Sequence, residues 1–96
     1  MYGTIARMKL KPGAEAEMTR MIRETAPQIP GFAFQHIYKL DAGSNEYLIV
    51  IGFESKGAYV ANANSPEQHE RYQQYVNLLA APPEWNDGEI ISSLPV

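Results

Sequence analysis

The sequence predicts an α+β fold in which a four-stranded antiparallel sheet carries helices on one face. Residues 46–53, EYLIVIGF, form the most continuously apolar stretch, and a strand that is apolar on both sides must be covered on both sides. Residues 2–11 and 32–40 alternate as half-buried strands do, whereas 14–26 and 66–80 have helical periodicity. With a last short strand, the order becomes β-α-β-β-α-β. This ferredoxin-like arrangement places the first and third strands at the centre of the sheet.

Length and composition favour one globular domain spanning residues 1–96. The chain is 45% hydrophobic and 20% charged, as in ordinary globular proteins. Its net charge of −3 gives no reason to expect nucleic acid as a partner. The absence of cysteine excludes disulfides and thiolate metal sites. Because no stretch approaches the ~20 apolar residues of a membrane span and the start lacks a signal-like apolar run, we expect a cytoplasmic protein without a membrane partner.

The first half of the chain reads as strand, helix and strand. Tyr2–Lys11 ends at Pro12-Gly13, because proline donates no ladder hydrogen bond and glycine turns freely. Ala14–Ala26 places Met18, Met21 and Ile22 on one apolar helical face. Pro27 and Pro30-Gly31 then stop the helix.

The second strand, Phe32–Leu40, alternates without a break in the sequence. Strict alternation places Phe32, Phe34, His36, Tyr38 and Leu40 on one face, which we assign to the helix-covered side. The turn-rich segment Asp41–Asn45 connects this strand to residues 46–53. The two strands are therefore expected to be antiparallel neighbours.

The second half begins with a weak short helix, Ala58–Asn64, and continues with a main helix, Pro66–Ala80. Ser65-Pro66 is a strong start signal, with serine as the cap and proline at the first helical position. The stretch Glu84–Gly88 reads as a turn-rich link, and Glu89–Leu94 as the last strand. The main helix has an expected inward stripe of His69, Tyr72, Val76 and Leu79, joined by Tyr75.

Several segments together resemble the antibiotic biosynthesis monooxygenase family of the dimeric α/β-barrel superfamily. They are RMKLKPGAEAEM, IPGFAFQHIYKL, YLIVIGFESKGAYVANANS and the helix start Ser-Pro-Glu-Gln-His-x-x-Tyr. The resemblance covers nearly the whole chain and implies a homodimer whose open sheet faces pack together, with a small pocket between sheet and helices in each subunit. Some members oxidise aromatic phenols or quinols with O2 and no cofactor, some degrade haem, and many have no known reaction.

The haem-degrading branch of the family does not fit this sequence. Its members are expected to have an asparagine on the first strand, where this chain has Tyr2-Gly3-Thr4-Ile5. The second helical region has Asn62 and Asn64 in place of a tryptophan, and His69 lies one turn before the ligand position, which is nearer Tyr72. No close pair of histidines suggests another metal site. We therefore expect no cofactor and no metal.

A cofactor-free oxygenase needs a dry apolar pocket and a base or hydrogen-bond donors, because the substrate phenol must lose a proton before its anion can reduce O2. His36 is the candidate proton acceptor, since a neutral imidazole accepts a proton near neutral pH. The alternative is a core or interface histidine. His69 is a candidate pocket residue, or else a solvated or capping side chain.

Four further residues are candidates for substrate binding. Tyr72 and Trp85 combine an apolar body with a polar tip, although core packing for Tyr72 and an interface or lid contact for Trp85 remain open. Asn62 can donate hydrogen bonds to a substrate oxygen or cap its weak helix. Arg7, a charge in a central strand, either pairs with a carboxylate such as Glu54 or Glu89 or anchors an anionic substrate.

Two hypotheses about function follow. The first is a homodimeric, cofactor-independent monooxygenase that acts on a small aromatic phenol or quinol. The second is a non-catalytic dimeric module that binds or senses a small hydrophobic molecule.

Overall fold

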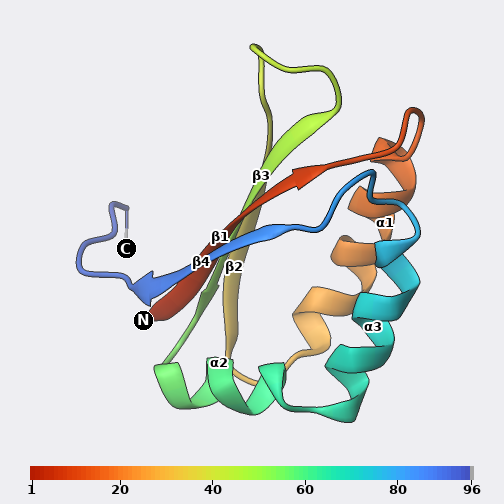
Figure 1. Cartoon of the computed structure of the whole chain (residues 1–96). Helices are drawn as coiled ribbons and strands as arrows, with labels where there is room; N and C mark the ends of the chain where they lie inside the picture. Colours follow the sequence, from red (N-terminus) through yellow and green to blue (C-terminus); the bar gives the residue numbers. More distant parts are fainter. Residues whose placement is uncertain (96) are drawn as a thin grey trace.

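The computed structural model describes residues 1–95, and within them the expected α+β, ferredoxin-like fold is confirmed (Figure 1). The sheet is antiparallel with the order β2-β3-β1-β4, so β1 and β3 are central as predicted. None of the helices in these residues is long and apolar enough to cross a lipid bilayer. The elements are β1 (Tyr2–Lys9), α1 (Glu15–Thr25), the 3-10 turn η1 (Ala26–Gln28), β2 (Phe32–Lys39), β3 (Glu46–Phe53), α2 (Lys56–Ala63), α3 (Pro66–Val76) and β4 (Glu84–Glu89).

The helices lie on one side of the sheet. Figure 1 shows α1 and α3 packed along one face, α2 across one end of the strands, and no helix on the opposite face of the described chain. The core fills the space under α1 and α3, and its largest fully buried side chains are Met18 and Ile49. From β1, Ala6 and Met8 also point into this core. The opposite face of the sheet is called the open face below.

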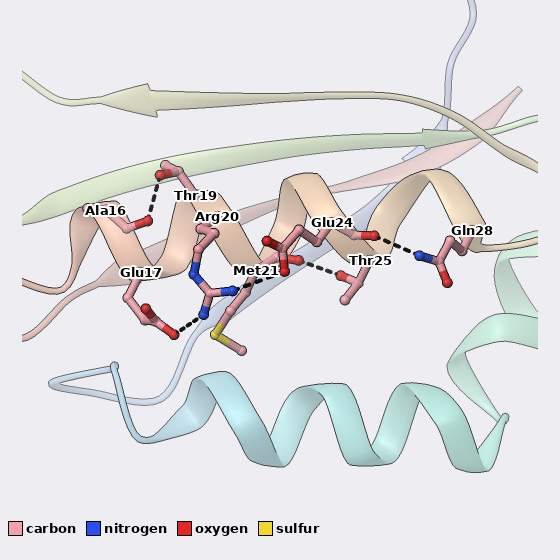
Figure 2. A network of polar contacts seen from close by, with 8 residues as sticks. All are labelled: Ala16, Glu17, Thr19, Arg20, Met21, Glu24, Thr25 and Gln28. Carbon is pink, nitrogen blue, oxygen red and sulfur yellow. Dashed lines mark hydrogen bonds and ion pairs between the residues drawn. The ribbon is translucent and has the colours of Figure 1, made fainter.

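Helix α1 is fixed to the sheet on one side and is polar on the other. The Tyr47 hydroxyl of β3 donates to Glu15 Oε1 at 2.8 Å, which ties the start of α1 to the sheet. On the outer side, Arg20 bonds both Glu17 and Glu24 (Figure 2). Because these ion pairs are exposed, they add little to the stability of the fold, and they mainly keep the outer side of α1 polar and solvated.

Both later helices begin at serine caps, and α3 is shorter than predicted. The Ser55 side chain accepts from the Ala58 N–H at 3.1 Å, and the Ser65 side chain from the Gln68 N–H at 3.1 Å. Helix α3 ends at Val76 and not at Ala80. The reason is that the next residues pair with the end of β1, where the Ala80 N–H donates to the Lys9 carbonyl at 2.7 Å. Val76 is 37% exposed and therefore does not belong to the inward stripe.

The last strand lies earlier than predicted. β4 is Glu84–Glu89, the segment expected to be a turn, and the predicted strand Glu89–Leu94 is wrong. Residues 84–89 pair one by one with residues 7–2 of β1, so the segment gains ladder hydrogen bonds that outweigh its poor strand propensity. The Asn86 amide adds a hydrogen bond to the Ile5 carbonyl at 3.1 Å.

A β-bulge near the start of β2 reverses the predicted faces of this strand. Phe32 pairs with Phe53 while Phe34 pairs with Gly52, so Ala33 is an additional residue without a partner on β3. Beyond the bulge, Gln35 and Ile37 point toward the helices, and the three aromatic side chains that were expected there lie on the open face. Glycine at position 52 leaves room for the Phe34 ring, because a Cβ there would lie 2.3 Å from it. The corrected set on the open face is Phe34, His36 and Tyr38.

Candidate functional site

A cavity of about 470 Å³ lies between the helix-facing side of the sheet and η1, α2 and α3. Its volume falls within the range of small-molecule sites, roughly 300–1,000 Å³. A smaller cavity of about 70 Å³ adjoins it under α1, and the two share seven lining residues, among them Ile22, Ile51, Tyr75 and Trp85. All four strands and four helical segments, α1, η1, α2 and α3, contribute to the larger cavity, so the whole fold determines its shape.

The floor of the cavity is a row of side chains from all four strands. Ile51 of β3 pairs with Thr4 of β1 on one side and with Gln35 of β2 on the other, and Thr4 pairs in turn with Asp87 of β4. All four residues line the cavity. The floor therefore presents one apolar residue between two neutral polar residues, with a carboxylate at the edge strand.

The walls are aromatic. Tyr72 and Tyr75 of α3 pack edge to face with ring centroids 5.3 Å apart, and Phe53 and Tyr59 do the same at 5.5 Å. Such walls suit a flat aromatic ligand, because ring stacking and edge contacts favour it over a flexible chain.

Tyr59 and Asp87 form the most strongly bonded polar pair at the cavity. The Tyr59 hydroxyl of α2 donates to Asp87 Oδ1 of β4 at 2.7 Å. Burial, reinforced by this carboxylate, raises the pKa of Tyr59 to about 12, and the neighbouring Thr4 hydroxyl opposes the rise only in part. Burial also raises the pKa of Tyr75. Both tyrosines therefore stay neutral hydrogen-bond donors at physiological pH.

Asn62 belongs to a network with Arg71. The Arg71 guanidinium donates to Asn62 Oδ1 at 2.9 Å and to Gln68 Oε1 at 3.1 Å. No acidic side chain of residues 1–95 pairs with Arg71 within 4.0 Å, so its charge is balanced only by amide oxygens. Arg71 lines the adjoining smaller cavity and not the larger one, so the network leaves a positive charge near the larger cavity, where it favours an anionic ligand.

His69 lies at the exposed rim of the cavity. One of its ring nitrogens is 3.2 Å from the Gln73 side-chain amide one helical turn later. Among residues 1–95 it is the one histidine that lines the cavity, and Asp87 is the one acidic residue that does so. These two side chains are therefore the available proton acceptors.

The structure brings together four of the six residues singled out from the sequence. Asn62, His69, Tyr72 and Trp85 all line the cavity. Their roles in binding remain predictions.

The other two residues do not reach the cavity. His36 was expected beside the pocket, but the bulge in β2 turns it to the open face, where its ring lies 5.7 Å from that of Phe34. Arg7 also lies on the open face and pairs with Glu46 at 3.3 Å, not with Glu54 or Glu89. The expectation of a carboxylate partner was correct, and the partner named was wrong.

Sequence reasoning missed several cavity residues, among them Thr4, Gln35, Asp87 and Tyr59. Thr4 shares the parity of Ala6 and Met8, so its inward direction could have been recognised. Gln35 was hidden by the bulge and Asp87 by the misplaced last strand. Tyr59 gave no signal beyond its place on a weak helix. Within the described chain, no group of three or more histidine, aspartate or glutamate side chains is arranged to bind a metal ion.

Comparison with known proteins relates the chain to solved structures. No family model matches the sequence, and no curated protein matches it. SnoaB, a cofactor-independent oxygenase from Streptomyces nogalater, is 18% identical with a TM-score of 0.79, over 99% of this chain and 97% of SnoaB.

Two further structures, both provisionally named antibiotic biosynthesis monooxygenases, extend this likeness. The protein from Chloroflexus aurantiacus is 20% identical with a TM-score of 0.78, over 96% of this chain and 94% of its own. The protein from Nitrosomonas europaea is 19% identical with a TM-score of 0.75, over 96% of this chain and 100% of its own. At these identities the likeness establishes the fold, and the resemblance expected from the sequence is confirmed at that level.

Proposed function

We propose that this chain, which has the fold of the antibiotic biosynthesis monooxygenases, binds a small aromatic phenol or quinol in its cavity and oxidises it with O2 without a cofactor. The observation that supports this most is the aromatic-walled cavity of about 470 Å³ with a histidine at its rim. SnoaB, which shares the fold, is described as a cofactor-independent oxygenase. An apolar cavity suits the reaction because it excludes the water that would stabilise the substrate anion and hold it back.

The first step of the proposed reaction is removal of the phenolic proton. His69 accepts it, because a neutral imidazole is a common proton acceptor and this histidine lies at the rim of the cavity. The wall tyrosines do not compete, since burial raises the pKa of Tyr59 and Tyr75 and keeps them protonated. The substrate is then the phenol that ionises. The Arg71 charge beside the wall stabilises the resulting phenolate.

The second step transfers electrons from the phenolate to O2. The reduced oxygen adds to the ring carbon para to the oxygen, and loss of water from the resulting hydroperoxide leaves a quinone. A hydroxyarene with a para C–H thereby gives up four electrons to O2, and one O2 is converted into one new carbonyl oxygen and one water. The protein supplies position, proton transfer and electrostatics.

We also propose that the chain works as a homodimer through its open face. Ile5 is 47% exposed and Tyr38 is 57% exposed on this face, and Phe34, Val50 and Leu48 lie on the same face. A second copy would remove these apolar side chains from water. Arg7 and Glu46 neutralise each other, so the face carries no strong charge against self-association.

Oxygen uptake with anthrone as the probe substrate tests the proposal. Wild-type protein should consume O2 above the buffer rate and produce anthraquinone. His69→Ala should slow this by 10²-fold or more, about the contribution of a positioned base. His36→Ala is the matched control and should keep the wild-type rate, because that histidine lies on the open face. Equal rates for His69→Ala and wild type would exclude His69 as the proton acceptor.

The alternative is a non-catalytic binding module. Two buried oxygens at the cavity floor, Thr4 Oγ1 and Gln35 Oε1, favour this alternative. They lack hydrogen-bond partners, and a bound ligand would supply them whether or not it reacts. Saturable binding of hydroxylated aromatics with no product on prolonged aerobic incubation would decide for this alternative.

A further inference from the structure

The floor of the cavity contains two buried polar atoms without hydrogen-bond partners. They are Thr4 Oγ1 and Gln35 Oε1, and neither makes a hydrogen bond of good geometry among residues 1–95, although the Tyr59 hydroxyl is close enough to Thr4 for the Thr4 hydroxyl to lower the pKa of Tyr59. Buried polar groups are nearly always bonded, because an unpaired one has lost its water and gained nothing in return. Both residues line the same cavity, so the two unpaired oxygens occur at one place in the fold.

The two residues are placed symmetrically. Each pairs with Ile51, Thr4 from β1 and Gln35 from β2, so they flank one apolar side chain at the same level of the sheet. Neighbouring strands are about 4.8 Å apart, so the two backbone positions are separated by about 10 Å. A flat molecule lying over Ile51 has one edge toward Thr4 and the opposite edge toward Gln35.

The position of Gln35 depends on the bulge. Without the bulge, that is, with Ala33 paired regularly, strict alternation from Phe32 would send Gln35 to the open face and His36 to the cavity. Bulges commonly re-aim a side chain beside a functional site. Here the re-aimed side chain is an amide whose oxygen lacks a partner, which a purely structural bulge would not require.

We propose that Gln35 and Thr4 determine the specificity of the cavity for an aromatic ligand with hydroxyl groups on two opposite edges. Gln35 Oε1 accepts a hydrogen bond from the hydroxyl at one edge. The Thr4 hydroxyl bonds the oxygen at the other. Both oxygens are covered in the ligand-free side-chain positions, so ligand binding requires rotation of the soft amide torsion of Gln35 and a rotamer change of Thr4.

The proposal excludes ligands whose hydroxyl at the Gln35 edge is alkylated. A methoxy oxygen has no proton to donate, so it leaves Gln35 Oε1 buried and unpaired beneath the ligand. Sites built to bond a substrate hydroxyl reject analogues that lack it far more strongly than apolar pockets reject an extra methyl group. This inference rests on the proposed function only in placing the ligand in this cavity.

The test is calorimetric titration of the full-length protein with 2,6-dihydroxynaphthalene and with 6-methoxy-2-naphthol. Wild type should bind the diol at least 10-fold more tightly. Gln35→Met, which keeps the length of the side chain and removes the amide, should bind the diol about 10-fold more weakly and lose most of the discrimination. Thr4→Val is the second variant and should also weaken diol binding. Gln28→Met is the matched control, because Gln28 is exposed and lies outside the cavity.

Thermal unfolding provides an independent readout. Without ligand, Gln35→Met and Thr4→Val should raise Tm, because each removes an unpaired buried oxygen. A purely structural role for these side chains predicts a lower Tm.

The outcomes separate this inference from the proposed function. If wild type and Gln35→Met bind both probes equally, the specificity role is overturned and the cavity remains a binding site. If wild type binds neither probe, both proposals are contradicted. Selective diol binding without oxidation of any phenol would sustain the inference and overturn the oxygenase.

Discussion

The Tyr59 hydroxyl donates to the Asp87 carboxylate at 2.7 Å and so joins α2 to the edge strand β4. Tyr59 packs on two other rings, with centroids 5.2 Å from Tyr2 and 5.5 Å from Phe53. Asp87 thereby gains a fixed position at the end of the cavity floor. A short helix of low propensity and an edge strand of turn-forming residues are each weak alone, and this contact stabilises both.

The raised pKa of Tyr59 predicts a loss of stability in alkali. The pKa is about 12 in the folded protein against an ordinary value of 10.0. Because the folded value is raised, the contribution of Tyr59 is fully present below pH 10 and is lost as the pH rises toward 12. Urea unfolding at pH 8 and pH 11 should show this loss.

Tyr59→Phe is the control for this alkaline effect. At pH 8 the variant should be less stable by about 1 kcal/mol, because it loses the hydrogen bond to Asp87. It should also lose less stability than wild type between pH 8 and pH 11. An equal alkaline loss in the two proteins would assign the effect to other tyrosines.

Gly3 and Gly88 face each other across β1 and β4, yet only one of them should tolerate a side chain. A Cβ at Gly3 would lie 2.0 Å from the Ile51 carbonyl oxygen, a backbone atom of the central strand. A Cβ at Gly88 would meet nothing within 4 Å. Gly3→Ala should therefore cost about 2 kcal/mol or more, as overpacking against a fixed neighbour does. Gly88→Ala should change the free energy of unfolding by less than about 0.5 kcal/mol.

Denaturant unfolding of the two variants, read by circular dichroism, measures this difference. Similar stabilities for Gly3→Ala and Gly88→Ala would show that β1 and β3 separate easily at this point.

Val50 and Ile49 are sequence neighbours on opposite faces of β3. Substitutions at these two positions therefore test the proposed dimer interface and the core separately. Val50 pairs with Ile5 and His36 on the open face, whereas Ile49 is 2% exposed beneath the helices. Val50→Asp should give a folded monomer, because it places a charge in the proposed dimer interface. Ile49→Asp should not fold, because it buries an unpaired charge in the core.

Light scattering measures the oligomeric state of both variants, and circular dichroism shows whether each variant is folded. A wild-type monomer at micromolar concentration would contradict the dimer directly. If Val50→Asp remained a dimer, the interface would have to lie on another surface.

The sequence predicted those parts of the fold that depend on periodicity and on local stop and start signals. The bounds of β3 are those of the apolar run Glu46–Phe53, and α3 begins at its Ser65 cap as expected. These features succeed because burial pattern and capping are local properties of the chain.

The predictions failed where the structure of a segment depends on partners that are distant in the sequence. Whether β2 contains a bulge depends on how Phe32 and Phe34 fit against Phe53 and Gly52, about twenty residues away, and nothing in FAFQHIYK marks it. One additional residue then inverted the assignment of every later side chain of β2 and moved the candidate base from His36 to His69. The segment EWNDGE forms a strand only because the edge of β1 is available to pair with it.

The central claim, that substrate reacts in the cavity between sheet and helices, is tested most directly by blocking that cavity. Ala63 lines it at the end of α2 and is exposed, so Ala63→Trp should fold normally and fill the entrance. Ala61→Trp, on an exposed position of the same helix outside the cavity, is the control. With anthrone, oxygen uptake should fall to the buffer rate in Ala63→Trp and stay at the wild-type rate in Ala61→Trp. Unchanged uptake by folded Ala63→Trp would contradict the account.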